Sequence, residues 1–255
     1  MKKTFILLIF FTLTSCSLIF TNRALKKTGV LDEKSELKII KSKKQEILFI
    51  PMHHVGRKEY YNDVANKIDS LQNQNFTVFY EGVIDSKETD SLTRKKSLLK
   101  LRKIMGFFPQ GQKGYLDTTT NVIAGKIKYK GQYKLINQPS HKQLKVDSLN
   151  SIRADISLTE LITEFEKNNG EIKLDSCDYQ FSLKGKEYKC KKAKRSLRKI
   201  FEREYVKSYR NKYLAERIFN SKKNKILIVY GDAHYTGLWY ELYLLEKNYN
   251  SVGIK

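Results

Sequence analysis

Short apolar runs alternate with longer segments of helical pattern along most of this chain. Residues 46–52 (EILFIPM) and 76–80 (FTVFY) are apolar runs, and residues 57–75 between them carry apolar side chains at helical spacing. Such runs predict strands buried on both faces, which is typical of parallel sheets covered by helices. Further strands are expected at 133–137, 225–230 and 251–254, and further helices at 85–105, 117–127, 140–150, 154–168, 193–219 and 236–248. The sequence therefore predicts one α/β domain at residues 45–255, with a mostly parallel sheet flanked by helices on both faces and a small helical and hairpin cap.

The first fifteen residues have the pattern of a bacterial lipoprotein signal peptide. Lys2 and Lys3 precede an apolar run at residues 5–11, and small residues then lead to Cys16. This order is typical of a cleaved signal peptide, and the run is too short to span a bilayer. We expect Cys16 to carry the lipid, residues 16–44 to form a polar tether, and the protein to lie in the cell envelope, at the outer membrane or facing the periplasm. The alternative is a buried N-terminal strand or helix with a cysteine there by chance.

The chain is strongly basic, with 49 Lys and Arg against 27 Asp and Glu. Removal of the predicted signal peptide takes away two lysines and no acid, which leaves a net charge of +20. This balance favours anionic partners such as lipid head groups. Most of the basic residues are Lys, however, whereas phosphate recognition favours Arg, and no nucleic-acid motif is present. We therefore expect a solvated basic surface, with no nucleic-acid partner.

Two cysteines remain in the mature chain. Cys177 and Cys190 flank a polar segment that has the pattern of two short strands around a turn at Lys184 and Gly185. Such a hairpin brings the two cysteines nearly opposite one another, and export permits a disulfide. We expect a Cys177–Cys190 disulfide in the cap; free buried thiols are the alternative.

Polar side chains follow three of the predicted strands. His54 follows residues 46–52, Glu81 follows 76–80, and His234 follows 225–230. Because the carboxyl ends of parallel strands meet at one edge, these three side chains are expected to converge there. Two imidazoles and a carboxylate suit a divalent ion such as Mn, Fe, Co or Zn, and they equally suit acid–base catalysis without a metal.

At these residues the sequence resembles the TraB/GumN family, which includes the TIKI metalloproteases. The matching blocks are residues 48–82, and Arg210-Asn211 followed by Gly231-Asp232-Ala233-His234-Tyr235-Thr236-Gly237. Pro51 stands where the family has Gly, so an inactive site is one possible outcome. The resemblance extends in fold to erythromycin esterases and to ChaN-like haem-binding lipoproteins.

The resemblance implies a metal-dependent hydrolase, with a peptide or small molecule as substrate. His54 and His234 are expected as metal ligands, and Glu81 as the third ligand or as the base that activates water. His53 and Asp232 are expected to hold a ligand's second ring nitrogen, and Arg210 to neutralise an oxyanion or pair with an acid.

Two alternatives belong to other classes of protein. The first is a haem- or iron-binding lipoprotein, in which His54 or His234, Met52 and Tyr235 are the candidate axial ligands. The second is a catalytically inactive interaction protein, which would be favoured if the strand-end residues were separate in space. A loop at residues 106–114, with Phe107 and Phe108, is expected to be a lid or, alternatively, to pack into the core.

Overall fold

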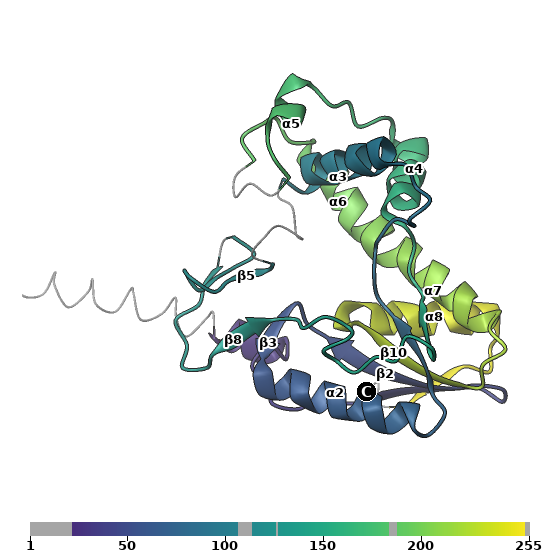
Figure 1. The fold of residues 1–255 in the computed structure, drawn as a ribbon. Helices are drawn as coiled ribbons and strands as arrows, with labels where there is room; N and C mark the ends of the chain where they lie inside the picture. The colour runs from purple at the N-terminus through teal and green to yellow at the C-terminus, as the bar shows by residue number, and fades with distance from the viewer. Residues whose placement is uncertain (1–21, 107–113, 126, 184–187, 253–255) are drawn as a thin grey trace, which may run out of the picture.

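Six strands form the central sheet of the computed structural model, which describes residues 22–106, 114–125, 127–183 and 188–252. The strands are β1 (Lys38–Lys41), β2 (Glu46–Met52), β4 (Thr77–Tyr80), β9 (Ser151–Arg153), β10 (Lys225–Gly231) and β11 (Asn250–Val252). Their order in the sheet is β11-β1-β2-β10-β4-β9 (Figure 1). β2, β10, β4 and β9 are parallel, and β1 is antiparallel to both of its neighbours. The predicted α/β fold with a mostly parallel sheet is confirmed.

Helices cover both faces of this sheet. They are α2 (Lys58–Gln72) on one face, and α7 (Arg210–Phe219) and α8 (Tyr235–Leu245) on the other (Figure 1). Successive side chains of a strand point to opposite faces, so β10 divides its apolar run between two cores. Ile226 and Ile228 pack with α7 and α8, whereas Leu227 and Val229 pack with α2. The central strands are apolar along most of their length because both of their faces are buried.

A group of helices stands beyond the sheet and forms the cap (Figure 1). They are α3 (Ser91–Met105), α4 (Leu158–Asn169), α5 (Ser176–Gln180) and α6 (Arg195–Ile200). α6 continues through a π-helical segment, η1 (Phe201–Tyr209), directly into α7. α6, η1 and α7 thus form one continuous helix, as predicted for residues 193–219, and this helix joins the cap to the sheet. The cap has its own apolar core, which includes Ile104, Phe165 and Phe201.

The first helix of the cap begins later than predicted. The side chain of Asp90 accepts a hydrogen bond from the backbone N–H of Thr93 and is the N-cap of α3. Asp85 instead accepts from the backbone N–H of Thr159 at 2.7 Å, near the start of α4. Both residue types favour helix starts, and tertiary contact decides which helix each one serves.

The middle of the chain differs most from the prediction. Residues 117–127 are not helical; the structure has three short strands there, β5 (Leu116–Asp117), β6 (Val122–Ile123) and β7 (Ile127–Lys128). Asn121, Ala124 and Gly125 have positive φ, which a right-handed helix excludes. Residues 140–150 contain turns rather than a helix, and residues 151–153 are strand β9. The strand predicted at 133–137 exists as β8 (Leu135–Asn137), but it pairs with β3 (Val55–Arg57) outside the central sheet.

The domain begins before residue 45, the predicted boundary. β1 lies inside the sheet, and Ile40 is fully buried. Ahead of β1, the backbone N–H and hydroxyl of Ser35 donate to the Asp63 carboxylate on α2. Residues 35–44 thus belong to the folded domain and not to the predicted tether. Within the described ranges, no helix combines the length and apolar character needed to cross a bilayer.

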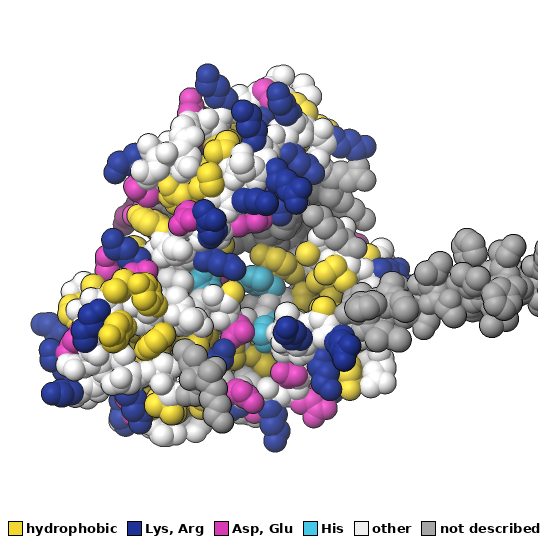
Figure 2. All heavy atoms as spheres, turned by 180° about the vertical axis from the view of Figure 1, so that it is seen from behind, with side chains coloured by type: hydrophobic (Ala, Val, Ile, Leu, Met, Phe, Trp, Pro, Cys, Tyr) yellow, Lys and Arg dark blue, Asp and Glu magenta, His cyan; other side chains and the backbone are white. Residues whose placement is uncertain are grey.

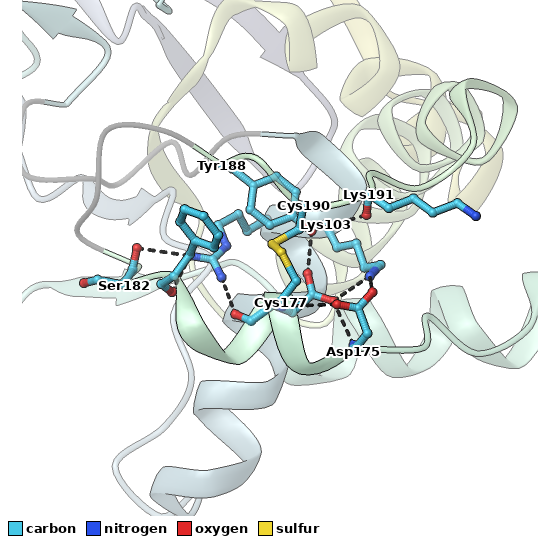
Figure 3. The surroundings of a disulfide bond; sticks show 10 residues. Lys103, Asp175, Cys177, Ser182, Tyr188, Cys190 and Lys191 are labelled. Atoms are coloured by element: carbon cyan, nitrogen blue, oxygen red, sulfur yellow. Dashed lines mark hydrogen bonds and ion pairs between the residues drawn. A yellow bond between two sulfur atoms is a disulfide. The ribbon is translucent and has the colours of Figure 1, made fainter.

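The predicted cap disulfide joins Cys177 and Cys190, whose Cα atoms are 5.8 Å apart. The first cysteine lies on α5, so the predicted strand around it is wrong; Asp175 caps this short helix and fixes its start. Beside the disulfide, Lys103 of α3 pairs with Asp175 at 2.9 Å and with the fully buried Asp178 (Figure 3). Residues 184–187 and the predicted lid residues 107–113 lie outside the described residues.

Candidate functional site at the carboxyl edge of the sheet

The three predicted site residues follow their strands at the carboxyl edge of the sheet. His54 follows β2, Glu81 follows β4, and His234 ends the short 3-10 turn η2 (Asp232–His234) after β10. His54 and Glu81 line a cavity of about 490 Å³ between the sheet edge and the cap. Histidine side chains are visible in the hollow between the lower and upper parts of the molecule in Figure 2. The parallel topology thus assembles polar groups from distant parts of the sequence.

Arg210, the first residue of α7, lies at the centre of this group. Its side chain is 4 % exposed. Nη2 donates to Glu81 Oε1 at 2.7 Å and to Asp155 Oδ2 at 2.7 Å, while Nε donates to Asp155 Oδ1 at 3.0 Å. The bidentate contact with Asp155 fixes the plane of the guanidinium. One buried cation therefore joins two carboxylates.

Asp155 is a site residue that sequence reasoning missed. It lies two residues after β9, and its side chain is fully buried. Besides Arg210, it accepts a hydrogen bond from the backbone N–H of Gly82 at 3.0 Å, directly after Glu81. Its position follows the same strand-end rule as the other residues, but the strand before it was not recognised.

Hydrogen bonds to both carboxylate oxygens keep Glu81 in its charged form. Oε1 accepts from Arg210, and Oε2 accepts from the backbone N–H of Gly231 at 2.8 Å. Burial alone would raise the pKa of Glu81, but the charge and hydrogen bond of Arg210, aided by His234 and His54, lower its pKa to about 2. A side chain at Gly231 would place its Cβ 3.3 Å from Oε2, so the close approach favours glycine there.

His234 is buried and held by Asn211. Its Nδ1 is 2.7 Å from Oδ1 of Asn211, the residue after Arg210. Burial and then the charge of Arg210 lower the pKa of His234 to about 4, so the ring is neutral near pH 7. A Cβ at Gly237 would collide with the Asn211 amide, which explains a glycine three residues after the histidine.

The predicted partners His53 and Asp232 do not hold this ring. Asp232 forms an ion pair with Lys38 of β1. The ring of His53 lies against Tyr60, with centroids 5.2 Å apart, and next to Gly29 of the N-terminal segment. Neither residue lines the cavity. His53 directly precedes His54 and points to the opposite side, and the 3-10 turn η2 directs Asp232 away from His234.

His54 is the exposed histidine of the site. Its ring stacks on Tyr115 with centroids 4.0 Å apart and planes within 3°. Although the ring faces the cavity, the surrounding protein removes water and lowers the pKa of His54, and this outweighs the opposing charge of Glu81. His54 is therefore neutral near pH 7 and has access to the cavity.

His141 lines the same cavity and was not predicted there. Its ring packs against Tyr80 at 4.5 Å between centroids, and burial lowers the pKa of His141. The available signal was its position shortly after the apolar segment at 133–137. That segment pairs with β3 beside the sheet edge, which brings His141 back to the cavity.

Pro51 fits its strand without disturbing the sheet. β2 pairs with β1 only as far as Phe49, so Pro51 faces no partner on that side. On the other side it lies opposite Tyr230 of β10, and its carbonyl accepts from the Tyr60 hydroxyl. A proline is tolerated where its missing N–H has no partner in the ladder.

The residues as they lie do not fit the expected divalent ion. Arg210 binds Glu81 with Nη2, and its Nη1 is 3.5 Å from Nε2 of His234. A guanidinium thus occupies the position between two of the three predicted ligands, where a second cation would be repelled. Within the ranges that the structure describes, no group of three or more His, Cys, Asp or Glu side chains is arranged to hold a metal.

Comparisons with protein-family models, with curated proteins and with solved structures found no match to this chain. The resemblance to TraB/GumN proteins accordingly rests on the two strand-end motifs and on Arg210-Asn211. These are the same residues that meet around Glu81 in the structure.

Stability should fall in mild acid because His234 is buried in its neutral form. The unfolded chain binds this proton near pH 6.5, whereas the folded protein binds it only near pH 4. The contribution is fully present above pH 6.5 and is lost as the pH falls toward 4, and it amounts to about 2 kcal/mol between pH 7 and pH 5. Glu81, with a folded pKa of about 2, contributes in the same direction only below pH 4.5.

Urea unfolding at pH 7 and pH 5 measures this effect. A His234→Gln variant is expected to lose about 2 kcal/mol less than wild type between these two pH values. The other three histidines are common to both proteins, so the difference isolates His234. Equal losses in the two proteins would contradict the assignment.

Proposed function

We propose that the protein is a hydrolase of the cell envelope that cleaves an amide or ester bond in the cavity. The observation that supports this most directly is the presence of a neutral imidazole, His54, and the Glu81–Arg210 pair on one cavity wall. A base that accepts a proton and a fixed positive charge near it are the groups that hydrolysis of a carbonyl compound requires.

Each residue has a distinct role in this proposal. His54 removes a proton from water, because its neutral ring is the accessible base of the site. The water oxygen bonds to the carbonyl carbon, the ester or amide bond breaks, and His54 returns the proton to the leaving alcohol or amine. Nη1 of Arg210, which binds neither carboxylate, faces the oxygen on which negative charge develops. Asp155 and Glu81 bind the other two nitrogens and hold the guanidinium so that it does not reorganise during the reaction. Asn211 and His234 bind each other beside Arg210 and hold the adjoining part of the site in place. No step is assigned to a metal, since Arg210 fills the place of one.

The test is hydrolysis of p-nitrophenyl esters and p-nitroanilides by the purified mature domain. His54→Ala is expected to lower kcat/KM at least a hundredfold, the usual contribution of a positioned base. His53→Ala is the matched control, because the adjacent ring lies outside the cavity and should retain activity. Equal activity of His54→Ala and wild type would contradict the proposal. Loss of activity in EDTA, restored by Mn, Co, Fe or Zn, would instead favour the metal-dependent mechanism.

The structure leaves fewer candidate axial ligands for haem than the sequence suggested. Met52 and Tyr235 are 4 % and 3 % exposed and pack in the two cores of the sheet, and His234 is bonded to Asn211. Of the candidate axial ligands, His54 alone lines the cavity. A Soret shift on addition of hemin that disappears in His54→Ala would favour haem binding over hydrolysis. The interaction-protein alternative loses its main argument, since Glu81 and His234 both contact Arg210.

We further propose that Cys16 is acylated and anchors the domain to a membrane. The support is the order of charge, apolar run and small residues before Cys16. Mass spectrometry of the full chain after expression in bacteria is expected to find lipid on wild type, and Cys16→Ser is expected to lose it and leave the membrane fraction. A lipidated Cys16→Ser product would contradict the proposal.

A further inference from the structure

The cavity has two chemically different ends. Toward the sheet it is lined by His54, Glu81, His141 and Arg210. Toward the cap it is lined by apolar side chains from α3, α4 and η1, namely Leu98, Leu101, Leu158, Leu161, Phe201 and Val206. Several of these, including Leu98, Leu101 and Val206, are only half-buried because they face the cavity. A volume of about 490 Å³ lies within the range of small-molecule sites.

The guanidinium at the polar end is already paired with carboxylates. Arg210 contributes one positive charge, and it is bound by two carboxylates, Glu81 and Asp155. The histidines near it have lowered pKa values and do not add positive charge near pH 7. A ligand that brings a free carboxylate or phosphate to this end meets the Glu81 carboxylate and does not find Arg210 as a free cation.

We propose that the substrate is an amphipathic molecule with an uncharged ester or amide bond at the sheet edge and a hydrocarbon chain or ring against α3, α4 and η1. This inference rests on the proposed function, because it takes the same cavity as the reaction site. The half-buried leucines supply the driving force, since every methylene that leaves water strengthens binding up to about fourfold. An anionic head group at the sheet edge is disfavoured, because Glu81 lines this end and Arg210 is already paired.

Calorimetric titration with octanamide, butanamide and octanoate tests the inference without requiring turnover. Octanamide should bind at least tenfold more tightly than butanamide, because four further methylenes enter the apolar end. Octanoate should bind less tightly than octanamide, since its carboxylate meets Glu81. Leu101→Ser should reduce the octanamide-to-butanamide ratio several-fold. Leu92→Ser is the matched control on the same helix, because Leu92 is 58 % exposed and lies outside the cavity lining, and it should retain the ratio.

The outcomes separate this inference from the proposed function. Equal affinity for the two amides, tightest binding of octanoate, or an unchanged ratio in Leu101→Ser would overturn the inference, even if esters are hydrolysed. Chain-length-dependent binding in wild type and in His54→Ala would support it, even if no ester is hydrolysed and the proposed reaction fails.

Discussion

Replacement of Arg210 by Met is expected to lower the free energy of unfolding by about 3–5 kcal/mol, because it leaves two carboxylates without their cation. Asp155 is fully buried and receives two hydrogen bonds from the guanidinium, and Glu81 receives one. Methionine fills a similar volume, so the loss comes from uncompensated charge rather than from a void. No other ion pair among the described residues joins two carboxylates to a cation as deeply buried as Arg210.

Arg198→Met is the matched control for this experiment. Arg198 lies on α6, in the same continuous helix as Arg210, and pairs with Glu202 at 2.8 Å. Both side chains of this pair are at least one-third exposed. Exposed pairs contribute about 0–1 kcal/mol, so this variant should remain close to wild type in urea at pH 7. An Arg210→Met variant as stable as Arg198→Met would show that Glu81 and Asp155 do not depend on the guanidinium.

The architecture was predictable where strands are buried on both faces. β2, β4 and β10 consist of apolar runs long enough to be recognised without knowledge of their partners. β9 was missed because it is an edge strand of three residues, SIR, and only one of them is apolar. The strands β5, β6 and β7 were missed because two-residue strands have no periodicity to detect.

The candidate site was predictable to the same degree as its strands. Glu81 and His234 follow recognised strands and do meet at one edge, while Asp155 follows the strand that was missed. The position of Arg210 between them could not be inferred, because the rotation of a long helix depends on how it packs. The π-helical segment before Arg210 changes that rotation, and sequence spacing alone assumes 3.6 residues per turn.

Removal of the cap disulfide is the second change with a large expected effect. A Cys177→Ser/Cys190→Ser variant should lose about 3 kcal/mol of stability, because the disulfide closes a loop of 13 residues' separation and restricts the unfolded chain. The same region also contains Lys103, which binds Asp178 and Asp175 without help from the sulfur atoms (Figure 3). These ion pairs hold α5 against α3 in the folded state, so the cap should keep its shape when the disulfide is absent.

Unfolding in urea and ester hydrolysis together test this division of roles. The double-serine variant should unfold at lower urea concentration than wild type, while kcat/KM at moderate temperature stays within about twofold, because Leu98 and Leu101 remain on a folded α3. The matched control is wild type under reducing conditions, which should reproduce the variant's stability. If kcat/KM fell strongly under conditions in which the double-serine variant is fully folded, the disulfide, rather than the Lys103 ion pairs, would position the apolar end of the cavity. Loss of less than about 1 kcal/mol would contradict the prediction and would mean that closing this loop restricts the unfolded chain only slightly.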